Sequence, residues 1–194
     1  MKSFFYILFS IVISSNLYAQ NSGSMFYSTE FKWKIQIPEG FEKVDHEEWA
    51  RFQGKGEQAL EKTVGQDVIN QSKTIFVVKS GNFNYLETNY QPFDTKTDGS
   101  YEEANAFIND IVYKSFKENM PNTKVTNTRT KEKINNLLFY KNTFEIALPN
   151  GISMKMLMFS RLFGKKDFSV NIMFMDPEKG DEMLTAWKNS IFNN

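Results

Sequence analysis

Residues 138–175 read LFYKNTFEIALPNGISMKMLMFSRLFGKKDFSVNIMFM, and this stretch decides the fold. Two turn signals, Pro149-Asn150-Gly151 and Gly164-Lys-Lys-Asp167, divide it into three apolar runs of strand length. A Thr- and Lys-rich run over 124–134 comes before it and has the composition of an edge strand. The pattern predicts an antiparallel meander whose last three strands cover 138–148, 152–163 and 168–175.

Cross-strand pairing predicts the register of this meander. A three-residue loop at 149–151 places Glu145 opposite Lys155, a favourable charge pair. A four-residue turn at 164–167 places Phe163 opposite Phe168. One face of the sheet then holds Leu157, Phe159, Phe163, Phe168, Val170, Ile172 and Phe174. The other holds Tyr140, Phe144, Ile146, Leu148, Ile152, Met154, Met156, Met158, Met173 and Met175.

A sheet that is apolar on both faces must be covered on both faces. The available covers are an amphipathic helix over 101–119 on one face, and a helix over 177–192 with the 45–63 region on the other face or beside it. We therefore predict an α+β fold, a mostly antiparallel sheet with helices on both faces, which is an α/β/α sandwich.

The remaining elements follow from local signals. Residues 31–37 alternate strictly between apolar and polar side chains, and residues 74–79 are β-branched, so both are predicted strands. Helix N-caps are predicted at Asp45, Ser100 and Asp176. The first helix is expected to break at Gly54 or Gly56, with a second short helix over 57–63. The 101–119 helix is expected to bury a stripe of Ala104, Phe107, Ile108, Ile111, Val112, Ser115 and Phe116.

Two short motifs frame this order of elements. The opening strand ends in Ile37-Pro-Glu-Gly-Phe41, and the closing helix ends in Trp187-Lys-Asn-Ser-Ile-Phe192. In this order and with these ends, the chain resembles the PsbP-like superfamily, an α/β/α sandwich shared with DcrB-type envelope proteins. The resemblance implies a non-catalytic accessory or interaction domain. It transfers no site residue, and members differ in their partners, so it implies no particular partner.

The N-terminus has the pattern of an export signal. Lys2 is followed by a ten-residue apolar run over 4–13, and Ala19 ends a segment suited to signal-peptidase cleavage. An uncleaved membrane anchor is the alternative, but this run is shorter than the roughly 20 residues that span a bilayer. We expect a signal peptide over 1–19, a single domain over 20–194, and a periplasmic or secreted protein without a stable membrane span after cleavage.

Composition excludes several classes of function. The chain of 194 residues has no cysteine and one histidine, which excludes disulfides, thiol nucleophiles, and zinc sites built from Cys or several His. Lys plus Arg and Asp plus Glu both number 23, so no excess of positive charge exists to bind nucleic acid. We expect no cofactor and no enzymatic activity.

Isolated polar motifs point to no reaction. His46 starts a helix beside acidic residues, where it could act as a base or metal ligand, but HExxH is absent. Ser153 lies in no G-x-S-x-G motif. Asp94 and Asp98 resemble half of a calcium loop, but Lys96 stands where a third ligand is needed. A carboxylate-only enzyme such as a glycosidase remains open, although no suitable pair can be placed.

The methionines of the late strands form the one distinctive cluster. Thioethers bind Cu(I), and they share one sheet face at Met154, Met156, Met158, Met173 and Met175. The alternative is ordinary core, because methionine fills irregular gaps between a sheet and a helix. We favour the covered core. A partly open face would instead suit Cu(I) or a small apolar ligand.

A partner protein of the envelope or outside the cell is expected, and the longest irregular stretch offers a surface for it. Residues 81–99 are predicted to form a loop that presents Phe83, Tyr85, Tyr90 and Phe93. The alternative is that these rings fold back over the edge of the sheet.

Overall fold

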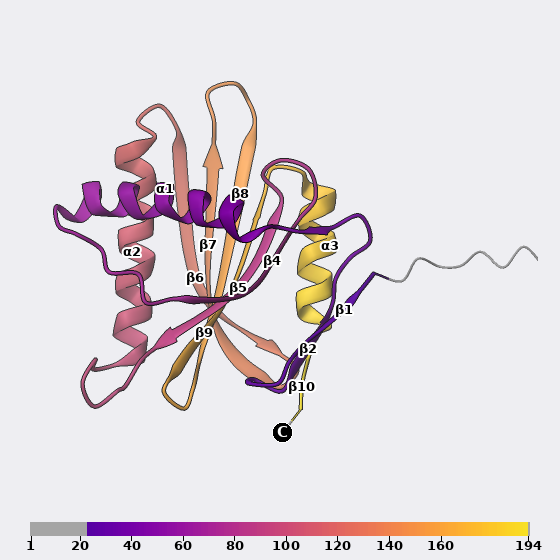
Figure 1. Ribbon diagram of the computed structural model, residues 1–194. Coiled ribbons are helices and arrows are strands. Elements are labelled where there is room, and N and C mark those ends of the chain that lie inside the picture. Colours follow the sequence, from indigo (N-terminus) through magenta and orange to yellow (C-terminus); the bar gives the residue numbers. More distant parts are fainter. Residues whose placement is uncertain (1–22, 194) are drawn as a thin grey trace, which may run out of the picture.

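The computed structural model describes residues 23–193 (Figure 1). Its helices are α1 (His46–Val64), α2 (Tyr101–Asn119) and α3 (Pro177–Lys188). Its strands are β1 (Met25–Ser28), β2 (Trp33–Gln36), β3 (Glu42–Lys43), β4 (Lys73–Lys79), β5 (Tyr85–Pro92), β6 (Lys124–Ile134), β7 (Leu137–Ala147), β8 (Ser153–Phe163), β9 (Lys166–Phe174) and β10 (Ile191–Phe192). The expected signal peptide lies outside the described residues.

A seven-stranded antiparallel sheet forms the middle layer, in the order β3-β4-β5-β9-β8-β7-β6. Helix α2 lies against one face, where it contacts β6 and β7. Helix α3 and a small sheet of β1, β2 and β10 cover the other face. Helices α2 and α3 lie on opposite sides of the sheet in Figure 1. The predicted fold class, an antiparallel sheet with helices on both faces, is confirmed.

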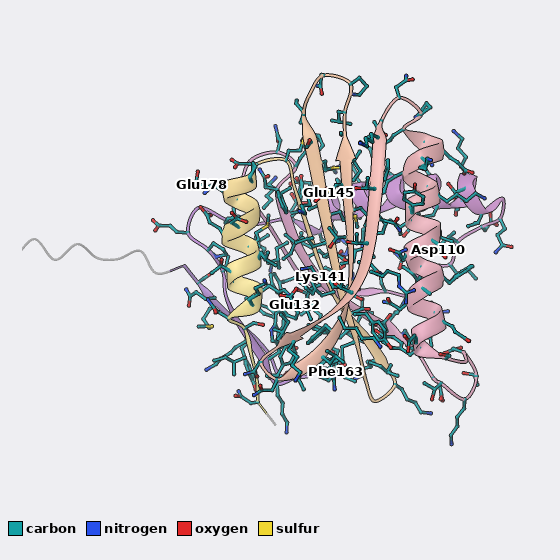
Figure 2. All side chains as sticks on the ribbon, turned by 180° about the vertical axis from the view of Figure 1, so that it is seen from behind. Asp110, Glu132, Lys141, Glu145, Phe163 and Glu178 are labelled. Carbon is teal, nitrogen blue, oxygen red and sulfur yellow. The ribbon has the colours of Figure 1, made fainter. Side chains whose placement is uncertain are left out.

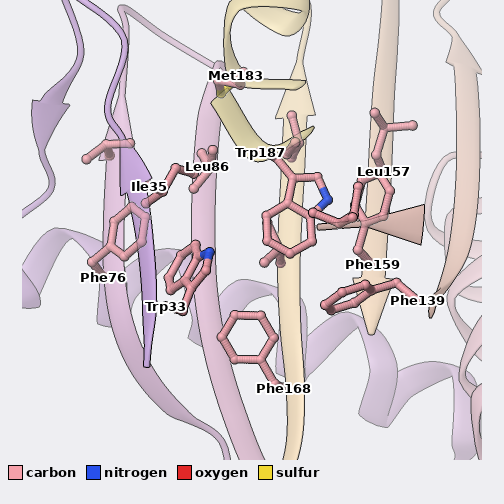
Figure 3. Close-up of a cluster of buried hydrophobic side chains, with 14 of the residues drawn as sticks. Trp33, Ile35, Phe76, Leu86, Phe139, Leu157, Phe159, Phe168, Met183 and Trp187 are labelled. Atoms are coloured by element: carbon pink, nitrogen blue, oxygen red, sulfur yellow. The ribbon is translucent and has the colours of Figure 1, made fainter. Parts of the chain in front are cut away.

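The face under α3 carries the main core. Trp33 from β2 and Trp187 from α3 are both fully buried and pack edge to face, with ring centroids 6.1 Å apart. Around them lie the inward residues of six strands of the large sheet, among them Phe139, Phe159 and Phe168, all with no exposed surface (Figure 3). Burying a side chain of this size contributes about 1.5–3 kcal/mol, so this cluster supplies much of the free energy of folding.

An ion-pair cluster fastens α3 to the same face beside the core. The Glu132 carboxylate on β6 binds Lys141 Nζ on β7 at 2.7 Å and Lys188 Nζ at the end of α3 at 2.8 Å. Glu132 and Lys141 lie next to each other in the view from behind (Figure 2). The two lysines oppose the effect of burial and hold the Glu132 pKa below its ordinary value.

The predicted register is right for one hairpin and wrong for the next. Glu145 pairs with Lys155 across β7 and β8, as expected. Across β8 and β9, however, Phe163 pairs with Lys166 and not with Phe168. The turn contains two residues instead of four, because Gly164 adopts a positive φ of 61° that suits a tight type II′ hairpin. The shift is two residues, so every side chain keeps its predicted face.

Three other expectations are wrong. Residues 81–99 are not one loop, since β5 occupies their centre and pairs with both β4 and β9. Helix α1 does not break at Gly54 or Gly56; it runs to Gly65, which ends it in the left-handed conformation. Helix α1 also lies on the same face as α2, where Trp49 packs over Val77, instead of joining α3.

The three predicted N-caps are confirmed. The side chains of Asp45, Ser100 and Asp176 each accept a backbone N–H of the following first turn. Within residues 23–193, none of the helices combines the length and apolar character needed to cross a bilayer.

Candidate functional site

A polar patch interrupts the sheet face beneath α1 and α2. Strand pairing brings Asn89 of β5, Ser169 of β9 and Ser160 of β8 into one row. A neighbouring row contains Glu87, Asn171, Met158 and Asn142 from strands β5, β9, β8 and β7, in that order. A covered sheet face is normally apolar, so polar side chains on four adjacent strands are unusual here.

Helix α2 turns polar side chains toward this patch. Asn105 and Asn109 are 8% and 2% exposed, and the amide nitrogen of Asn105 donates to Ser160 Oγ at 2.7 Å. The predicted apolar stripe of α2 is therefore only half right. Its C-terminal part, Val112 and Phe116, packs in the core, but Phe107 is 63% exposed.

A cavity of about 480 Å³ lies beside the first half of α2, over the polar patch of the sheet. We call it the α2 cleft, and its remaining wall is formed by the end of α1 and the segment 68–72. Its floor is the polar patch, and its lip carries the exposed apolar side chains Ile69, Phe107 and Ile108. This size is within the range of small-molecule sites, which cover roughly 300–1,000 Å³.

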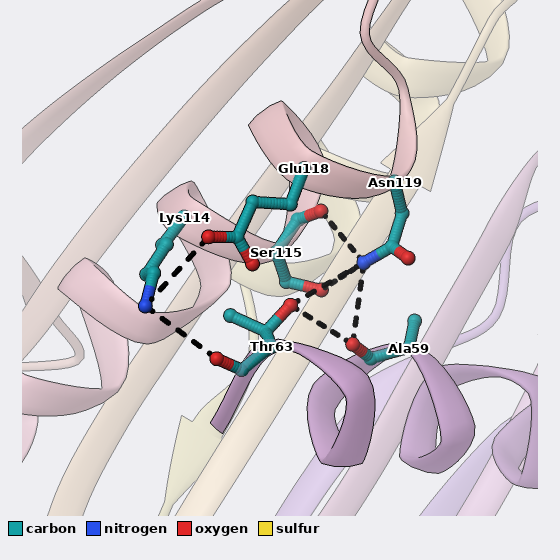
Figure 4. Close-up of polar contacts among 6 residues, drawn as sticks. All are labelled: Ala59, Thr63, Lys114, Ser115, Glu118 and Asn119. Atoms are coloured by element: carbon teal, nitrogen blue, oxygen red, sulfur yellow. Dashed lines mark hydrogen bonds and ion pairs between the residues drawn. The ribbon is translucent and has the colours of Figure 1, made fainter. Parts of the chain in front are cut away.

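Polar contacts join α1 to α2 next to the cleft's neighbouring apolar cluster (Figure 4). The amide nitrogen of Asn119 donates to Ala59 O at 3.2 Å and to Thr63 Oγ1 at 3.3 Å. Lys114 Nζ lies 3.5 Å from Thr63 O and 3.6 Å from Glu118 Oε1. These contacts join the last turns of both helices. The α2 cleft lies beside the first half of α2, between this helix, the second half of α1 and the sheet.

Asp167 on β9 is the best-organised group in the cleft. Tyr101 Oη donates to one carboxyl oxygen at 2.6 Å, and Gln91 Nε2 donates to the other at 3.2 Å. Burial raises the pKa of Asp167, while these two hydrogen bonds oppose the rise. Burial and the neighbouring carboxyl also raise the pKa of Tyr101, so its hydroxyl stays protonated and acts as a donor.

Glu87 is a second acidic group at the edge of the floor. It is 7% exposed and accepts Asn171 Nδ2 at 2.9 Å. Burial raises its pKa, and the hydrogen bond from Asn171 only partly opposes this effect. Strand pairing sets Glu87 opposite Asn171, which is four residues from Asp167 along β9. The backbones that carry the two acids are therefore about 13 Å apart along the strand direction.

The methionine cluster packs among apolar side chains, with Met154 buried and its other four members half-buried. Met154 is 8% exposed, and all five thioether side chains belong to one cluster with Phe144 on the sheet and with Val112 and Phe116 of α2. Met158 stands at the border, since it also lines the α2 cleft. Among residues 23–193, no group of three or more His, Cys, Asp or Glu side chains could hold a metal ion.

The four aromatic residues proposed for partner binding do not form one surface. Tyr85 packs beneath α1 against Trp49, whereas Tyr90 points to the opposite face of the sheet and packs against Phe31. Phe93 packs edge to face on Tyr101, and Phe83 is 48% exposed in a turn. Their common loop is absent, because β5 carries two of them on alternate sides. Partner binding by these residues stays a prediction.

The isolated polar motifs have structural surroundings. His46 is exposed at the start of α1. Asp94 binds Lys165 Nζ at 2.6 Å, and this lysine together with the backbone N–H of Lys96 lowers the Asp94 pKa. The Asp98 carboxylate accepts the backbone N–H of Asp94, so the half calcium loop is a turn closed by its own side chains.

Comparison with known proteins supports the fold. No protein-family model matches the chain, and no curated protein matches it. The solution structure of cyanobacterial PsbP (CyanoP) from Synechocystis sp. PCC 6803 aligns with a TM-score of 0.57, at 9% identity, over 89% of this chain and 93% of that one. The chain has the PsbP-like fold. A crystal structure from Bacteroides thetaiotaomicron at 1.50 Å resolution aligns with a TM-score of 0.45, at 8% identity, over 89% of this chain and 49% of that one.

Sequence reasoning predicted the PsbP-like fold but missed the α2 cleft. The signal was present as polar residues at inward positions of the meander, namely Asn142, Ser160, Ser169 and Asn171. The same signal occurs on α2 as Asn105 and Asn109, which share a helix face at a spacing of four residues. Buried amides of this kind lower stability unless they are paired, so their position marks a candidate site.

Proposed function

We propose that the protein is an exported, non-catalytic accessory module that binds a small molecule in the α2 cleft. The observation that carries this proposal is the cleft itself: a cavity with a floor of buried polar side chains and an apolar lip. Binding sites for small molecules usually combine a mostly apolar wall with a few fixed polar groups. An envelope or secreted protein would be the partner that such a module serves.

Several features support a binding role over a catalytic one. A glycosidase needs two carboxyl groups that face one cleft, no more than about 9.5 Å apart. Of Glu87 and Asp167, only Asp167 lines the α2 cleft. The Tyr101 hydroxyl and the Asp167 carboxyl are hydrogen-bonded to each other, and Ser160, the hydroxyl nearest to them, accepts a hydrogen bond from Asn105. The single histidine, His46, is exposed on α1 and does not line the cleft.

Export rests on the N-terminal sequence. Lys2, the apolar run over 4–13 and Ala19 match a cleaved signal peptide, so the protein would act in the periplasm or outside the cell. Cu(I) binding at the methionine cluster is the weaker alternative, because these side chains pack in one apolar cluster with Phe144, Val112 and Phe116. Met158 belongs to both candidate sites, since it is part of the methionine cluster and its side chain would also contact an apolar ligand in the α2 cleft.

Calorimetric titration of the mature protein, residues 20–194, with 1-octanol tests this proposal. We expect saturable binding that weakens in Phe107→Ser, because Phe107 lies on the lip and is 63% exposed, so its loss does not disturb the core. Ile152→Ser is the matched control, since Ile152 is also exposed, at 45%, and lies outside the cleft. Equal affinities in both variants, or absence of saturable binding, would contradict the proposal.

A further inference from the structure

The floor of the α2 cleft contains buried oxygens that need hydrogen-bond donors. Oδ1 of Asn105 and Oδ1 of Asn142 have no hydrogen-bond partner among the residues that the structure describes. Both side chains are more than nine-tenths buried, at 8% and 2% exposed, and both line the cleft. Oδ1 of Asn171, the next floor residue on β9, is unpartnered in the same way. A buried acceptor without a donor costs about 1–3 kcal/mol, so these oxygens favour a ligand that donates.

The charged side chains that line the cleft also favour a ligand that donates hydrogen bonds. Two carboxyl groups line it, Glu57 at the lip and Asp167 on the floor, and no Lys, Arg or His of the described chain lines it. Asp167 already accepts two hydrogen bonds, and Glu57 accepts one from Asn70 at 2.6 Å. An anionic ligand would therefore meet negative charge and acceptor oxygens without a compensating cation.

The exposed apolar side chains at the lip of the cleft favour a ligand that also has an apolar part. Phe107 and Ile108 are 63% and 41% exposed on α2, and Ile69 is 82% exposed on the segment that faces them. Met158 supplies an apolar position on the floor itself. An apolar tail that covers these side chains would remove their surface from water at a gain of about 25 cal/mol for each Å².

We infer that the α2 cleft selects an amphiphile with an apolar tail and a polar head that donates hydrogen bonds and carries no negative charge, as in an alkyl amine or an alkyl alcohol. This inference rests on the proposed function and adds the chemical class of the ligand. The head lies on the amides of Asn105 and Asn142, and the tail leaves past Phe107.

Three probes of equal chain length test the selectivity: octylammonium, 1-octanol and octanoate, each titrated below its micelle concentration. We expect both donors to bind at least about tenfold more tightly than octanoate, because octanoate can only accept at neutral pH. Octanoate binding as tightly as the donors would overturn the inference and leave the proposed function standing. If none of the three probes binds, the proposed function fails as well.

A substitution on the floor separates head recognition from simple burial of the tail. Asn142→Leu keeps the branched arrangement of heavy atoms and removes the acceptor, so octanol and octylammonium should each bind about tenfold more weakly while octanoate loses nothing. Asn122→Leu, at an exposed position in the turn after α2, is the matched control and should leave all three affinities unchanged. An equal loss for all three probes in Asn142→Leu would contradict recognition of a donor. If this variant folds poorly, the comparison of the three probes in the wild-type protein still tests the inference.

Discussion

Replacing Asn142 by leucine should stabilise the protein in the absence of ligand. Asn142 lies in the middle of β7, is 2% exposed, and leaves its Oδ1 unpartnered among the described residues. Leucine has the same branched arrangement of side-chain heavy atoms, has no polar atom to desolvate, and is better suited to a buried strand position. A polar floor of this kind therefore lowers stability in exchange for function.

The size of the effect follows from that one oxygen. A buried acceptor without a donor costs about 1–3 kcal/mol, and the substitution removes this cost. For a domain of this length, 1 kcal/mol corresponds to a change of roughly 2–4 °C in the midpoint of thermal unfolding. We therefore expect Asn142→Leu to raise the free energy of unfolding by about 1–3 kcal/mol and the midpoint by several degrees.

Urea unfolding and thermal melts of the mature protein measure this change. The exposed variant Asn122→Leu should stay within about 0.5 kcal/mol of the wild type. If Asn142→Leu were less stable than the wild type by 1 kcal/mol or more, Asn142 would be a satisfied part of the fold. The reasoning that assigns its oxygen to a ligand would then be refuted.

Three further predictions concern other parts of the molecule. Gly180→Ala should lower the free energy of unfolding by about 1–3 kcal/mol relative to Gly54→Ala in urea titrations, because a Cβ at Gly180 would lie 2.5 Å from an aromatic ring whereas Gly54 has open space. Glu87→Gln should become more stable than the wild type as pH rises above 4.5, the ordinary pKa of a glutamate, as measured by unfolding at several pH values. The double variant Met156→Leu/Met158→Leu should bind Cu(I) no differently from the wild type in a titration, because both thioethers pack, partly buried, in an apolar cluster.

The sign of the Glu87 effect follows from its raised pKa. The folded protein retains the proton at pH values where the unfolded chain has lost it, so wild-type stability falls as pH rises from 4.5 toward the folded pKa. Glutamine carries no proton to lose and removes this dependence. Parallel pH profiles for Glu87→Gln and wild type would show that the carboxyl is not perturbed.

Two other results would contradict the packing described here. One is that Gly180→Ala proves as stable as Gly54→Ala, and the other is that the methionine variant binds Cu(I) more weakly than the wild type.

The sheet and its two faces could be predicted because period-2 alternation depends only on the strand itself. Glu145 and Lys155 were paired correctly because the loop at 149–151 has a definite length. The next hairpin was placed two residues out of register, since the sequence around Gly164 allows either a two-residue or a four-residue turn, and the backbone selects the tighter one.

The α2 cleft could not be predicted, because its polar residues occupy positions where the hydrophobic pattern of a covered strand or helix requires apolar ones. In β5, Leu86 and Thr88 face the core under α3, while Glu87 and Asn89 lie on the opposite face, where Asn89 lines the α2 cleft. That strand therefore has polar residues on a covered face and looks like a loop. Helix α2 was placed correctly, yet Phe107 faces the lip of the cleft because Asn105 and Asn109 occupy the inner face. Local sequence patterns indicate which side chains are buried in a packed core. A cavity lies in place of part of that core here, so these patterns do not reveal it.

The central claim is that the α2 cleft holds a ligand with a donor head. A ¹H–¹⁵N spectrum that resolves the side-chain amides, recorded during titration of the mature protein with octylammonium, tests it most directly. We predict progressive shifts of the Asn105 and Asn142 amide signals, with Asn122 unmoved. Saturable binding that leaves the Asn105 and Asn142 signals in place would contradict the claim.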